Sequence, residues 1–299
     1  MAYRIRDPDP GNEPGIMHMK KDTFKDKKCW ITGASSGIGA ALAIALSQQG
    51  AFLLLSGRRN NSLQEVKNRC INPERVRIIS FDMEQVQFLP ELTRQVWNTF
   101  DGIDFAFLNA GFAVRDTILN TDYELVQKVM QSNFFGVVAL TKTLLPLMIQ
   151  RGGGRFVITS SLSGKYGIPK LGAYSASKHA LHGFFESLRA ELHSVGIRVT
   201  IIIPGLVRTE ISINSLRGDG TISGEMQQSI DGGISPEKCA MQMIGAVARG
   251  MNEIVIGGLE RHSVWFNRFF PGLFSWVIRN HPLRKIRSFR FPGNRAKNF

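Results

Sequence analysis

Apolar segments of strand length alternate with helical patterns along most of this 299-residue chain. The alternation is typical of repeated β-α-β units, whose parallel strands form a sheet covered by helices. We therefore predict a doubly wound α/β fold, undivided by any linker. The predicted strands are Cys29–Thr32, Ala51–Ser56, Val76–Phe81, Ile103–Leu108, Arg155–Thr159, Ile197–Ile203 and Glu253–Ile256. The predicted helices are Gly37–Gln49, Asn61–Cys70, Val86–Phe100, Asp122–Gln150, Tyr174–Val195 and Pro236–Gly250.

A glycine-rich turn joins the first predicted strand to the first predicted helix. It runs through Gly33, Ala34, Ser35, Ser36, Gly37, Ile38 and Gly39. Glycines at such a junction allow a tight turn, bring the backbone close to a phosphate and let the helix pack on the strand. A diphosphate would bind at the helix N-terminus, where free N–H groups and the helix dipole favour anions. At the first strand–helix junction of the series, the turn predicts a dinucleotide site.

The end of the second predicted strand carries two arginines and no acidic residue. Dinucleotide sites that prefer the unphosphorylated ribose usually place an acid there. This chain has Gly57 at that position, followed by Arg58 and Arg59. A guanidinium binds a phosphate bidentately, whereas a carboxylate would repel it. The sequence thus predicts NADP(H) rather than NAD(H); the alternative is that both arginines are solvated surface residues.

Residues after the third and fourth predicted strands should also reach the nucleotide, because ligands of open α/β sheets lie beyond the carboxyl ends of the strands. Asp82 and Met83 follow the third strand, and Asn109, Ala110 and Gly111 follow the fourth. Asp82 could accept a hydrogen bond from the adenine amino group, or it could cap the next helix. The small Ala110 and Gly111 would let the backbone pass close to the nucleotide.

Ser161, Tyr174 and Lys178 form a candidate catalytic set. Tyr174 and Lys178 are four residues apart in a predicted helix and share a face, and Ser161 precedes Tyr174 by thirteen residues. A phenol has a reference pKa of about 10. An ammonium group one turn away favours the phenolate and lowers that pKa, which suits proton transfer in carbonyl chemistry. Alone, the spacing of Tyr174 and Lys178 more often marks a solvated helix face.

Together these motifs resemble the short-chain dehydrogenase/reductase superfamily over residues 27–256. Two further motifs match, Ser132-Asn133 and Pro204-Gly-x-x-x-Thr209. The phrases YSASKHALHGFFESLRAEL and PGLVRTE are most similar to the branch containing 11-beta-hydroxysteroid dehydrogenase and the dehydrogenase/reductase member 7 group. The resemblance implies a Rossmann-type, seven-stranded parallel sheet with helices on both faces. It also implies a homodimer or homotetramer, paired through the helices 122–150 and 174–195.

The resemblance implies roles for individual residues. Tyr174 would be the general acid in reduction and the general base in oxidation, and Lys178 would hold the nicotinamide ribose. Ser161 would hydrogen-bond the substrate oxygen, and Asn133 would hold a water that links Lys178 to solvent. Thr209 would bind the carboxamide of the nicotinamide. Further cofactor contacts are expected from Pro204, Gly205 and Val207.

Two segments outside the motifs are expected to determine the substrate. The stretch between Thr209 and Pro236 is polar and without clear periodicity, which is typical of an active-site lid. Ser163–Leu171 should also contribute to the choice of substrate.

The predicted function is the NADPH-dependent interconversion of a carbonyl and a secondary alcohol on a lipophilic substrate such as a steroid, a sphingoid base or another lipid. The alternative is a catalytically idle nucleotide-binding protein that contacts a membrane or a partner through its C-terminal tail.

The two ends of the chain differ in composition from its body. Residues 1–26 are polar and rich in Pro and Gly, and we interpret them as a disordered leader or a remnant of expression. Residues 27–258 form the expected dehydrogenase domain, with its lid at about 209–235. Residues 259–299 form a tail of aromatic and basic residues with nine Lys or Arg and no acid beyond position 260. Such a tail suits a membrane interface, or its rings could pack on the body or on a partner.

The composition limits which other ligands and cellular locations we expect for this protein. Outside the tail the chain is only mildly basic, so we expect no nucleic-acid binding. There is no run of eighteen apolar residues and no signal-peptide pattern. The dispersed cysteines predict free thiols in a reducing compartment, and we expect a cytoplasmic protein with a peripheral contact to the cytoplasmic face of a membrane. No metal is expected, because the histidines near Tyr174 match no metal spacing and are interpreted as surface or packing residues. They are His179, His182 and His193.

Overall fold

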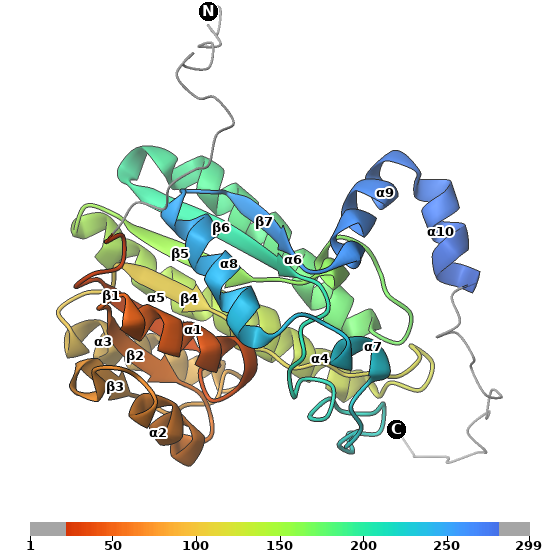
Figure 1. Ribbon diagram of the computed structural model, residues 1–299, viewed down its shortest axis with the longest axis horizontal. Helices are drawn as coiled ribbons and strands as arrows, with labels where there is room; N and C mark the ends of the chain where they lie inside the picture. Colours follow the sequence, from red (N-terminus) through yellow and green to blue (C-terminus); the bar gives the residue numbers. More distant parts are fainter. Residues whose placement is uncertain (1–21, 281–299) are drawn as a thin grey trace, which may run out of the picture.

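The computed structural model describes residues 22–280, and these form a parallel sheet between two layers of helices (Figure 1). Seven strands lie in this part of the chain: β1 (Lys28–Thr32), β2 (Phe52–Ser56), β3 (Val76–Ile78), β4 (Phe105–Leu108), β5 (Gly154–Thr159), β6 (Ile197–Pro204) and β7 (Glu253–Ile256). They pair in the order β3-β2-β1-β4-β5-β6-β7, every pair parallel. The predicted seven-stranded, doubly wound sheet is confirmed.

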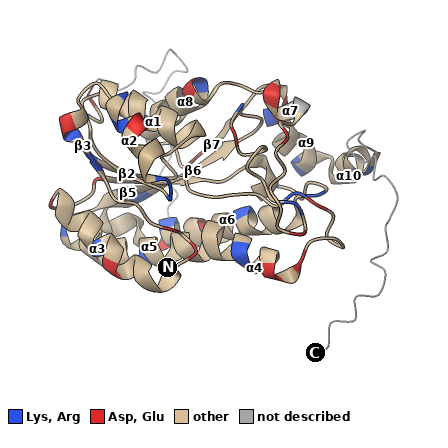
Figure 2. Cartoon of the chain, turned by 90° about the horizontal axis from the view of Figure 1, so that it is seen from below, with Lys and Arg blue, Asp and Glu red and all other residues tan. Residues whose placement is uncertain are grey.

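Helices cover both faces of the sheet, as Figure 2 shows from below. One layer holds α1 (Gly37–Gln48), α2 (Asn60–Asn68) and α8 (Pro236–Ala248). The other layer holds α3 (Leu89–Thr99), α4 (Tyr123–Met130), α5 (Gly136–Gln150) and α6 (Gly172–Leu192). A short α7 (Gln228–Asp231) interrupts the predicted lid, which is otherwise irregular. The strand ends that carry the predicted motifs therefore open at one edge of the sheet, between the two layers.

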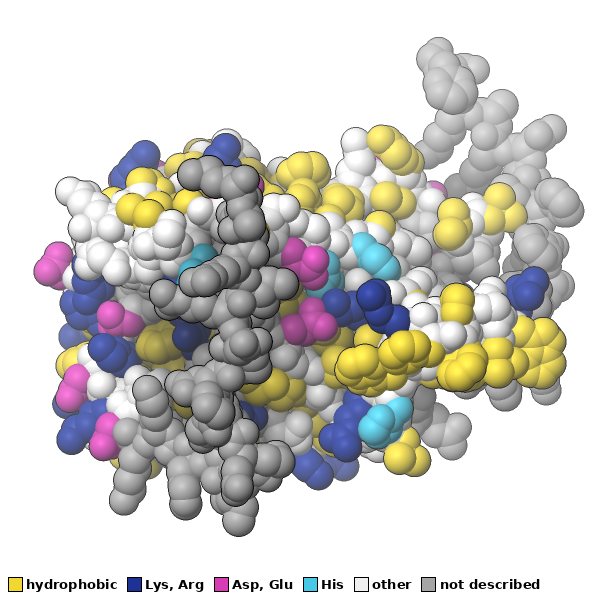
Figure 3. Space-filling view, turned by 90° about the horizontal axis from the view of Figure 1, so that it is seen from above, with side chains coloured by type: hydrophobic (Ala, Val, Ile, Leu, Met, Phe, Trp, Pro, Cys, Tyr) yellow, Lys and Arg dark blue, Asp and Glu magenta, His cyan; other side chains and the backbone are white. Residues whose placement is uncertain are grey.

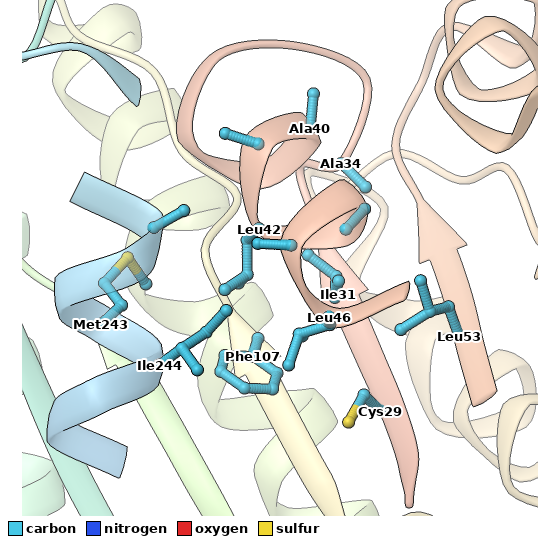
Figure 4. Packing of buried hydrophobic residues seen from close by; sticks show 14 of the residues in the cluster. Cys29, Ile31, Ala34, Ala40, Leu42, Leu46, Leu53, Phe107, Met243 and Ile244 are labelled. Atoms are coloured by element: carbon cyan, nitrogen blue, oxygen red, sulfur yellow. The ribbon is translucent and has the colours of Figure 1, made fainter. Parts of the chain in front are cut away.

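Two cores, one on each face of the sheet, hold the layers in place. In β2 the side chains of Leu53 and Leu55 face the α1 side, whereas Leu54 between them faces the α5 side, as the alternation of a strand requires. Figure 4 shows the first core, where Leu42 of α1 and Ile244 of α8 pack above the strands. Because both faces are covered, the strands are mostly apolar, and this is why the sequence identifies them well.

The predicted helix Asp122–Gln150 is continuous but not uniform. A π turn over Gln131–Phe135 (η3) joins α4 to α5 and contains the predicted site residue Asn133. By length and apolar composition this is the one helix among residues 22–280 that could cross a membrane, with a mean hydropathy of 1.4. It covers the sheet instead, with Leu140, Leu144 and Met148 fully buried in the second core.

The folded part of the chain begins earlier than the sequence predicts. Phe24 is fully buried, and its ring centroid lies 5.0 Å from that of Phe105 and 6.5 Å from that of Phe107. Lys27 was the predicted start of the domain, so at least Phe24 must be added to it. A single aromatic residue in a polar stretch carries no periodicity, which is why the sequence does not reveal this contact. The rest of the predicted leader, residues 1–21, lies outside the described residues.

The described part of the tail is helical and docks on the body. A 3₁₀ turn η6 (Leu259–His262) leads into α9 (Ser263–Phe269) and α10 (Pro271–Asn280), which project as a hairpin (Figure 1). Phe274 is buried, with its ring 4.7 Å from that of Tyr166. The hydroxyl of Tyr166 also lies 2.6 Å from the Ser263 hydroxyl. The hairpin is thus attached to the predicted substrate segment Ser163–Leu171. Residues 281–299 lie outside the described part.

Candidate active site

Two residues of the predicted catalytic set lie one turn apart near the start of α6. Both are buried, Tyr174 being 9% and Lys178 3% exposed. The ammonium nitrogen of Lys178 lies 5.6 Å from the centroid of the Tyr174 ring. It also donates a 2.8 Å hydrogen bond to the carbonyl oxygen of Thr159, at the end of β5. The helix face that these residues share therefore packs against the carboxyl end of a central strand and is not a solvated face.

Ser161 brings the third predicted side chain to Tyr174. Its Oγ accepts a 3.1 Å hydrogen bond from the backbone N–H two residues later, which fixes its orientation, and its side chain hydrogen-bonds Tyr174. The neighbouring Ser160 is directed elsewhere, because its Oγ lies 2.9 Å from Nε2 of His182. The structure thus places Ser161, and not Ser160, beside the Tyr174 hydroxyl.

Burial controls the ionisation of both groups on α6. It raises the pKa of Tyr174 to about 12, although the hydrogen bond from Ser161 and the charge of Arg115 act in the opposite direction. It lowers the pKa of Lys178 to about 8. The expectation that Lys178 lowers the pKa of Tyr174 is therefore not met in this structure. The cost of forming a phenolate in a buried site outweighs the nearby positive charge.

Asn133 lies fully buried in the π turn, behind the catalytic cluster. Its side-chain oxygen accepts a 3.0 Å bond from the Phe112 N–H, and its nitrogen donates a 2.9 Å bond to the Phe112 carbonyl. The same nitrogen donates to the Ser177 hydroxyl at 3.2 Å. A Cβ on Gly111 would lie 3.0 Å from the Asn133 oxygen and 3.5 Å from the Lys178 nitrogen. Gly111 thus allows the end of β4 to approach Asn133 and Lys178. The π turn that carries Asn133 is a feature frequent at functional sites.

The glycine turn has the geometry of a phosphate-binding loop. Gly33 and Gly37 have left-handed backbones, with φ of +67° and +54°, which glycine adopts without strain. At Gly39 a Cβ would lie 2.2 Å from the carbonyl oxygen of Gly33, so no side chain fits. The backbone N–H groups of Asn109 and Ala110 both donate to the hydroxyl of Thr32, at 3.0 and 3.1 Å. The two predicted nucleotide loops are therefore held together.

Of the two arginines after β2, the structure brings one onto the glycine turn. The Arg59 guanidinium donates hydrogen bonds to Ser36 Oγ at 2.9 Å and to Ser35 Oγ at 3.3 Å. It therefore lies over the loop, where an adenosine 2′-phosphate would require a cation. Arg58 instead lines a cavity of about 270 Å³. The remaining lining residues are Asp82, Glu84, Phe112, Lys128, Asn214 and Leu216.

Asp82 lies in that cavity and also closes a local turn. Its Oδ1 accepts a 3.0 Å bond from the N–H of Glu84, and it caps no α-helix, since α3 begins only at Leu89. The predicted contact from its carboxylate to adenine stays a prediction. Met83 is buried against the start of α5, where a Cβ on Gly136 would lie 2.7 Å from the Met83 carbonyl oxygen. Met83 thus packs the loop after β3 against the start of α5.

The loop after Pro204 returns across the glycine turn. A Cβ on Gly37 would lie 3.1 Å from the methyl group of Thr209, so Thr209 reaches the turn itself. Val207 is anchored by strand-like pairing with Ile234, at the end of the lid. The structure therefore brings the predicted cofactor residues from β1, β2, β4 and β6 to one edge of the sheet.

Glu260, which the sequence does not single out, ties the tail to this loop. Its Oε1 accepts bonds from the N–H groups of Leu206 at 3.0 Å and Gly258 at 2.9 Å. Gly205 faces the same carboxylate, because a Cβ there would lie 2.5 Å from Oε1. The contact joins positions 54 residues apart, and no local pattern signals it. A second residue that the motifs miss is Arg115, whose guanidinium interacts electrostatically with Tyr174.

His182, Glu186 and Glu253 are the one group of metal-ligating side chains that lies close together in the described part of the chain. The imidazole Nδ1 of His182 lies 3.5 Å from the Glu186 carboxylate and 3.8 Å from that of Glu253. Lys165 already binds Glu253 at 2.8 Å, and burial with the Lys165 charge lowers the pKa of His182 to about 4. We assign this group as a charged cluster around a neutral, buried packing histidine.

Comparison with known protein families finds a match to the model described as short chain dehydrogenase, over residues 27–219. Curated relatives include the dehydrogenase/reductase SDR family protein 7-like of Drosophila melanogaster, 34% identical over 88% of this chain and 83% of that protein. The SDR family member 7B of Xenopus tropicalis is 37% identical over 84% of both chains. These matches extend over the glycine turn, the catalytic cluster and the lid.

Solved structures agree with the fold. A short-chain dehydrogenase from Streptomyces avermitilis superimposes with a TM-score of 0.74 at 25% identity, covering 85% of this chain and 95% of its own. A short-chain dehydrogenase/reductase from Burkholderia phymatum, solved in complex with NAD, gives a TM-score of 0.72 at 21% identity, covering 82% and 94%. The seven-stranded architecture is therefore shared with proteins of distant sequence.

Proposed function

This chain belongs to the short-chain dehydrogenase/reductase family, in the branch of members 7 and 7B, and we propose that it reduces a lipophilic ketone to a secondary alcohol with NADPH. The observation that carries the proposal is the convergence of Ser161, Tyr174 and Lys178 at the carboxyl end of β5. Arg59 on the glycine turn supports the choice of NADPH.

The residues of the cluster divide the work of the reaction. A bound nicotinamide supplies a hydride, with two electrons, to the carbonyl carbon. Tyr174 gives its proton to the carbonyl oxygen, so that the C=O double bond becomes a C–H and an O–H bond. Ser161 donates a hydrogen bond to the same oxygen as negative charge develops there. Lys178 stabilises the phenolate left on Tyr174 until a proton returns from solvent, on a path that begins at Lys178 and Asn133.

The ionisation of Tyr174 suits the proton-donating step of a reduction. Burial raises its pKa to about 12, so the phenol is protonated at neutral pH and available as a donor. Oxidation of an alcohol would require the phenolate first. A general acid contributes about 10²–10⁴-fold to the rate, and a phenylalanine at position 174 would lose this contribution while keeping the ring.

The test is NADPH consumption over a panel of ketosteroids, keto-sphingoids and simple aryl ketones. We expect turnover of one lipophilic class, reduced about 10²–10⁴-fold in Tyr174→Phe, with NADPH binding retained. The matched control is Tyr123→Phe, which removes the hydroxyl of a tyrosine that is 71% exposed. Equal turnover by Tyr174→Phe would remove Tyr174 as the general acid. Tight NADPH binding without turnover of any class would favour the nucleotide-binding interaction protein instead.

The hairpin α9–α10 supports a lipophilic substrate and a membrane contact. Figure 3 shows hydrophobic side chains in a row along this projection. The strongly exposed ones are Trp265, Phe269, Phe270, Leu273 and Trp276. Arg261, Arg268 and Arg279 lie on the same segment. Rings at headgroup depth with arginines on anionic lipid are typical of interfacial helices, and the hairpin adjoins the substrate segment through Tyr166. We therefore propose that substrate enters from a membrane surface, on its cytoplasmic side.

Co-sedimentation with lipid vesicles tests this contact. The protein should bind vesicles of phosphatidylserine and phosphatidylcholine, less so phosphatidylcholine alone, and a Trp265→Ser/Trp276→Ser variant should lose most of the binding. Ile118→Ser, at an exposed apolar residue outside the tail, serves as the matched control. Binding that persists in the double variant would remove the hairpin from the contact.

We also propose a homodimer or homotetramer paired through α5 and α6. The exposed Phe135 at the start of this surface, half of whose area is accessible, supports an apolar contact there. Light scattering on a Phe135→Asp variant, compared with the parent protein, tests it: a shift to monomers is expected.

A further inference from the structure

Arg115 lies in the loop after β4, between the catalytic cluster and the lid. Its backbone N–H donates a 2.8 Å bond to the carbonyl of Leu216 in the lid. Ala113, two residues earlier, packs with Tyr174 and Leu171 in a small buried cluster. The guanidinium itself interacts electrostatically with Tyr174. Arg115 therefore forms part of the wall on the substrate side of the site, although no motif includes it.

The Arg115 side chain has no hydrogen-bond or ion-pair partner among the described residues. Its Nε is shielded from solvent and has no hydrogen-bond acceptor, and none of the ion pairs in the described part of the chain involves it. The adjacent Asp116 is already occupied, since its oxygens accept from the N–H groups of Thr117 at 2.7 Å and Gly218 at 3.2 Å. Burial lowers the pKa of the Arg115 guanidinium, a sign that its charge is partly desolvated.

A partly desolvated cation without a counter-ion is a cost to the folded state. Arg115 recovers none of this cost through a side-chain hydrogen bond within the described residues, so its charge serves no visible structural purpose. A guanidinium presents two parallel N–H groups that match the oxygens of a carboxylate or a phosphate. An anion that arrives with the substrate would complete this arrangement, within electrostatic reach of Tyr174.

We propose that Arg115 binds an oxyanion, a carboxylate or a phosphate ester, that the substrate carries close to its reacting carbonyl. This inference rests on the proposed function, because it takes Tyr174 as the group that protonates the carbonyl oxygen. The substrate class is then an anionic amphiphile, with an apolar chain, a ketone and a neighbouring acidic group, rather than a neutral steroid. The anion itself is unchanged by the reaction and serves only to orient the ketone.

Three ketones with the same alkyl chain test the proposal. They are a long-chain 2-oxo acid, its methyl ester, and the phosphate ester of the matching hydroxyketone. We expect the wild type to prefer one of the two anionic compounds over the ester, and that preference identifies the oxyanion. Arg115→Gln should raise KM for that compound about 10- to 100-fold, the range for one hydrogen bond between charged groups. It should change KM for the ester far less, because any effect of Arg115 through Tyr174 is shared by all three ketones, and Arg115→Lys should fall between. Arg94→Gln, an exposed arginine on α3, is the control.

A binding measurement keeps the proposal testable without turnover. Calorimetric titration of an alkyl carboxylate and an alkyl phosphate into the NADPH-saturated protein should give binding that Arg115→Gln abolishes and Arg94→Gln retains. Anion binding that depends on Arg115, in a protein that reduces no ketone, would uphold the site and refute the reductase function. Turnover of neutral ketones that depends on Tyr174, with no anion preference, would uphold the reductase function and refute the anion site.

The result that overturns the proposal is an equal loss on the acid and the ester in Arg115→Gln, with the pH–rate profile shifted to higher pH. That outcome would mean that Arg115 acts on the ionisation of Tyr174 and holds no part of the substrate.

Discussion

Arg59 offers the sharpest test of the cofactor site. Two substitutions probe it from opposite directions: Arg59→Ala removes the guanidinium that lies 2.9 Å from Ser36 Oγ, and Gly57→Asp introduces an acid where NAD-preferring sites carry one. The second substitution fits the space, because a Cβ on Gly57 would lie 3.5 Å from Ser35 Oγ and 3.8 Å from Leu63. These are ordinary contact distances, so the effect of Gly57→Asp should be electrostatic and not steric.

The size of the effect follows from the exposure of Arg59. A hydrogen bond between charged groups contributes about 1.5–3 kcal/mol. Arg59 is exposed, so solvent screening places its contribution in the lower half of that range, about 1.5–2 kcal/mol. Arg59→Ala should therefore raise the Kd for NADPH about 10- to 30-fold and leave the Kd for NADH unchanged. Gly57→Asp should weaken NADPH by a similar factor and strengthen NADH, since its carboxylate can accept from the free ribose hydroxyls.

Fluorescence titration of NADPH and NADH into each variant measures these constants without any substrate. The NADPH effect should shrink at high salt, because the charges are solvent-exposed. Arg69→Ala, an exposed arginine at the end of α2, is the matched control and should change neither constant. If Arg59→Ala weakened both cofactors equally, the arginine would act on the shape of the glycine turn. If it weakened neither, the assignment of the 2′-phosphate site would be refuted.

Three further substitutions test the fold around the site. Gly39→Ala should weaken NADPH binding about tenfold or more, because its Cβ would lie 2.2 Å from a backbone oxygen, whereas Gly183→Ala, with open space around it, should not. His182 has a pKa of about 4, below its unfolded value of about 6.5. The unfolded state therefore binds more protons between these values, and stability should fall by about 2–3 kcal/mol as the pH drops from 6.5 to 4. Urea unfolding of His182→Gln should show a smaller loss. Phe274→Ala should cost about 3–5 kcal/mol in docking the hairpin against Tyr166, seen as early proteolysis of α9–α10 with the thermal unfolding of the body unchanged.

The sheet and the helices that cover it could be predicted because short stretches of the sequence specify them. Buried parallel strands are continuous apolar runs, as in β2, and the glycine turn is specified by residues within seven positions. The strand boundaries differ by a few residues for a local reason too. β3 ends at Ile78 rather than Phe81, yet the N–H groups of Ile79 and Phe81 still donate hydrogen bonds to the end of β2 and the residue after it.

The residues of the candidate site could be predicted only where their spacing is fixed within one helix or one loop. Tyr174 and Lys178 share a helix, but their ionisation depends on burial by segments distant in sequence, and the predicted direction for Tyr174 was wrong for this reason. Arg58 and Arg59 are adjacent residues of the same type, so the sequence does not distinguish them. Only the geometry of the loop directs Arg59 to the glycine turn. Arg115 carries no spacing signal at all, because what distinguishes it is the absence of a hydrogen-bond or ion-pair partner among residues 22–280.

The tail is tied to the loops around the site at two points. Glu260 fixes the start of the tail to the cofactor loop through the N–H of Leu206, and Tyr166 fixes its last described helix to the substrate segment through Phe274. A force on the hairpin, such as insertion of its rings into a lipid surface, would therefore reach the two loops that flank the substrate. An amphiphilic ketone drawn from that surface would meet the aromatic hairpin with its chain and Arg115 with its charged end, which leaves the carbonyl between them at Tyr174.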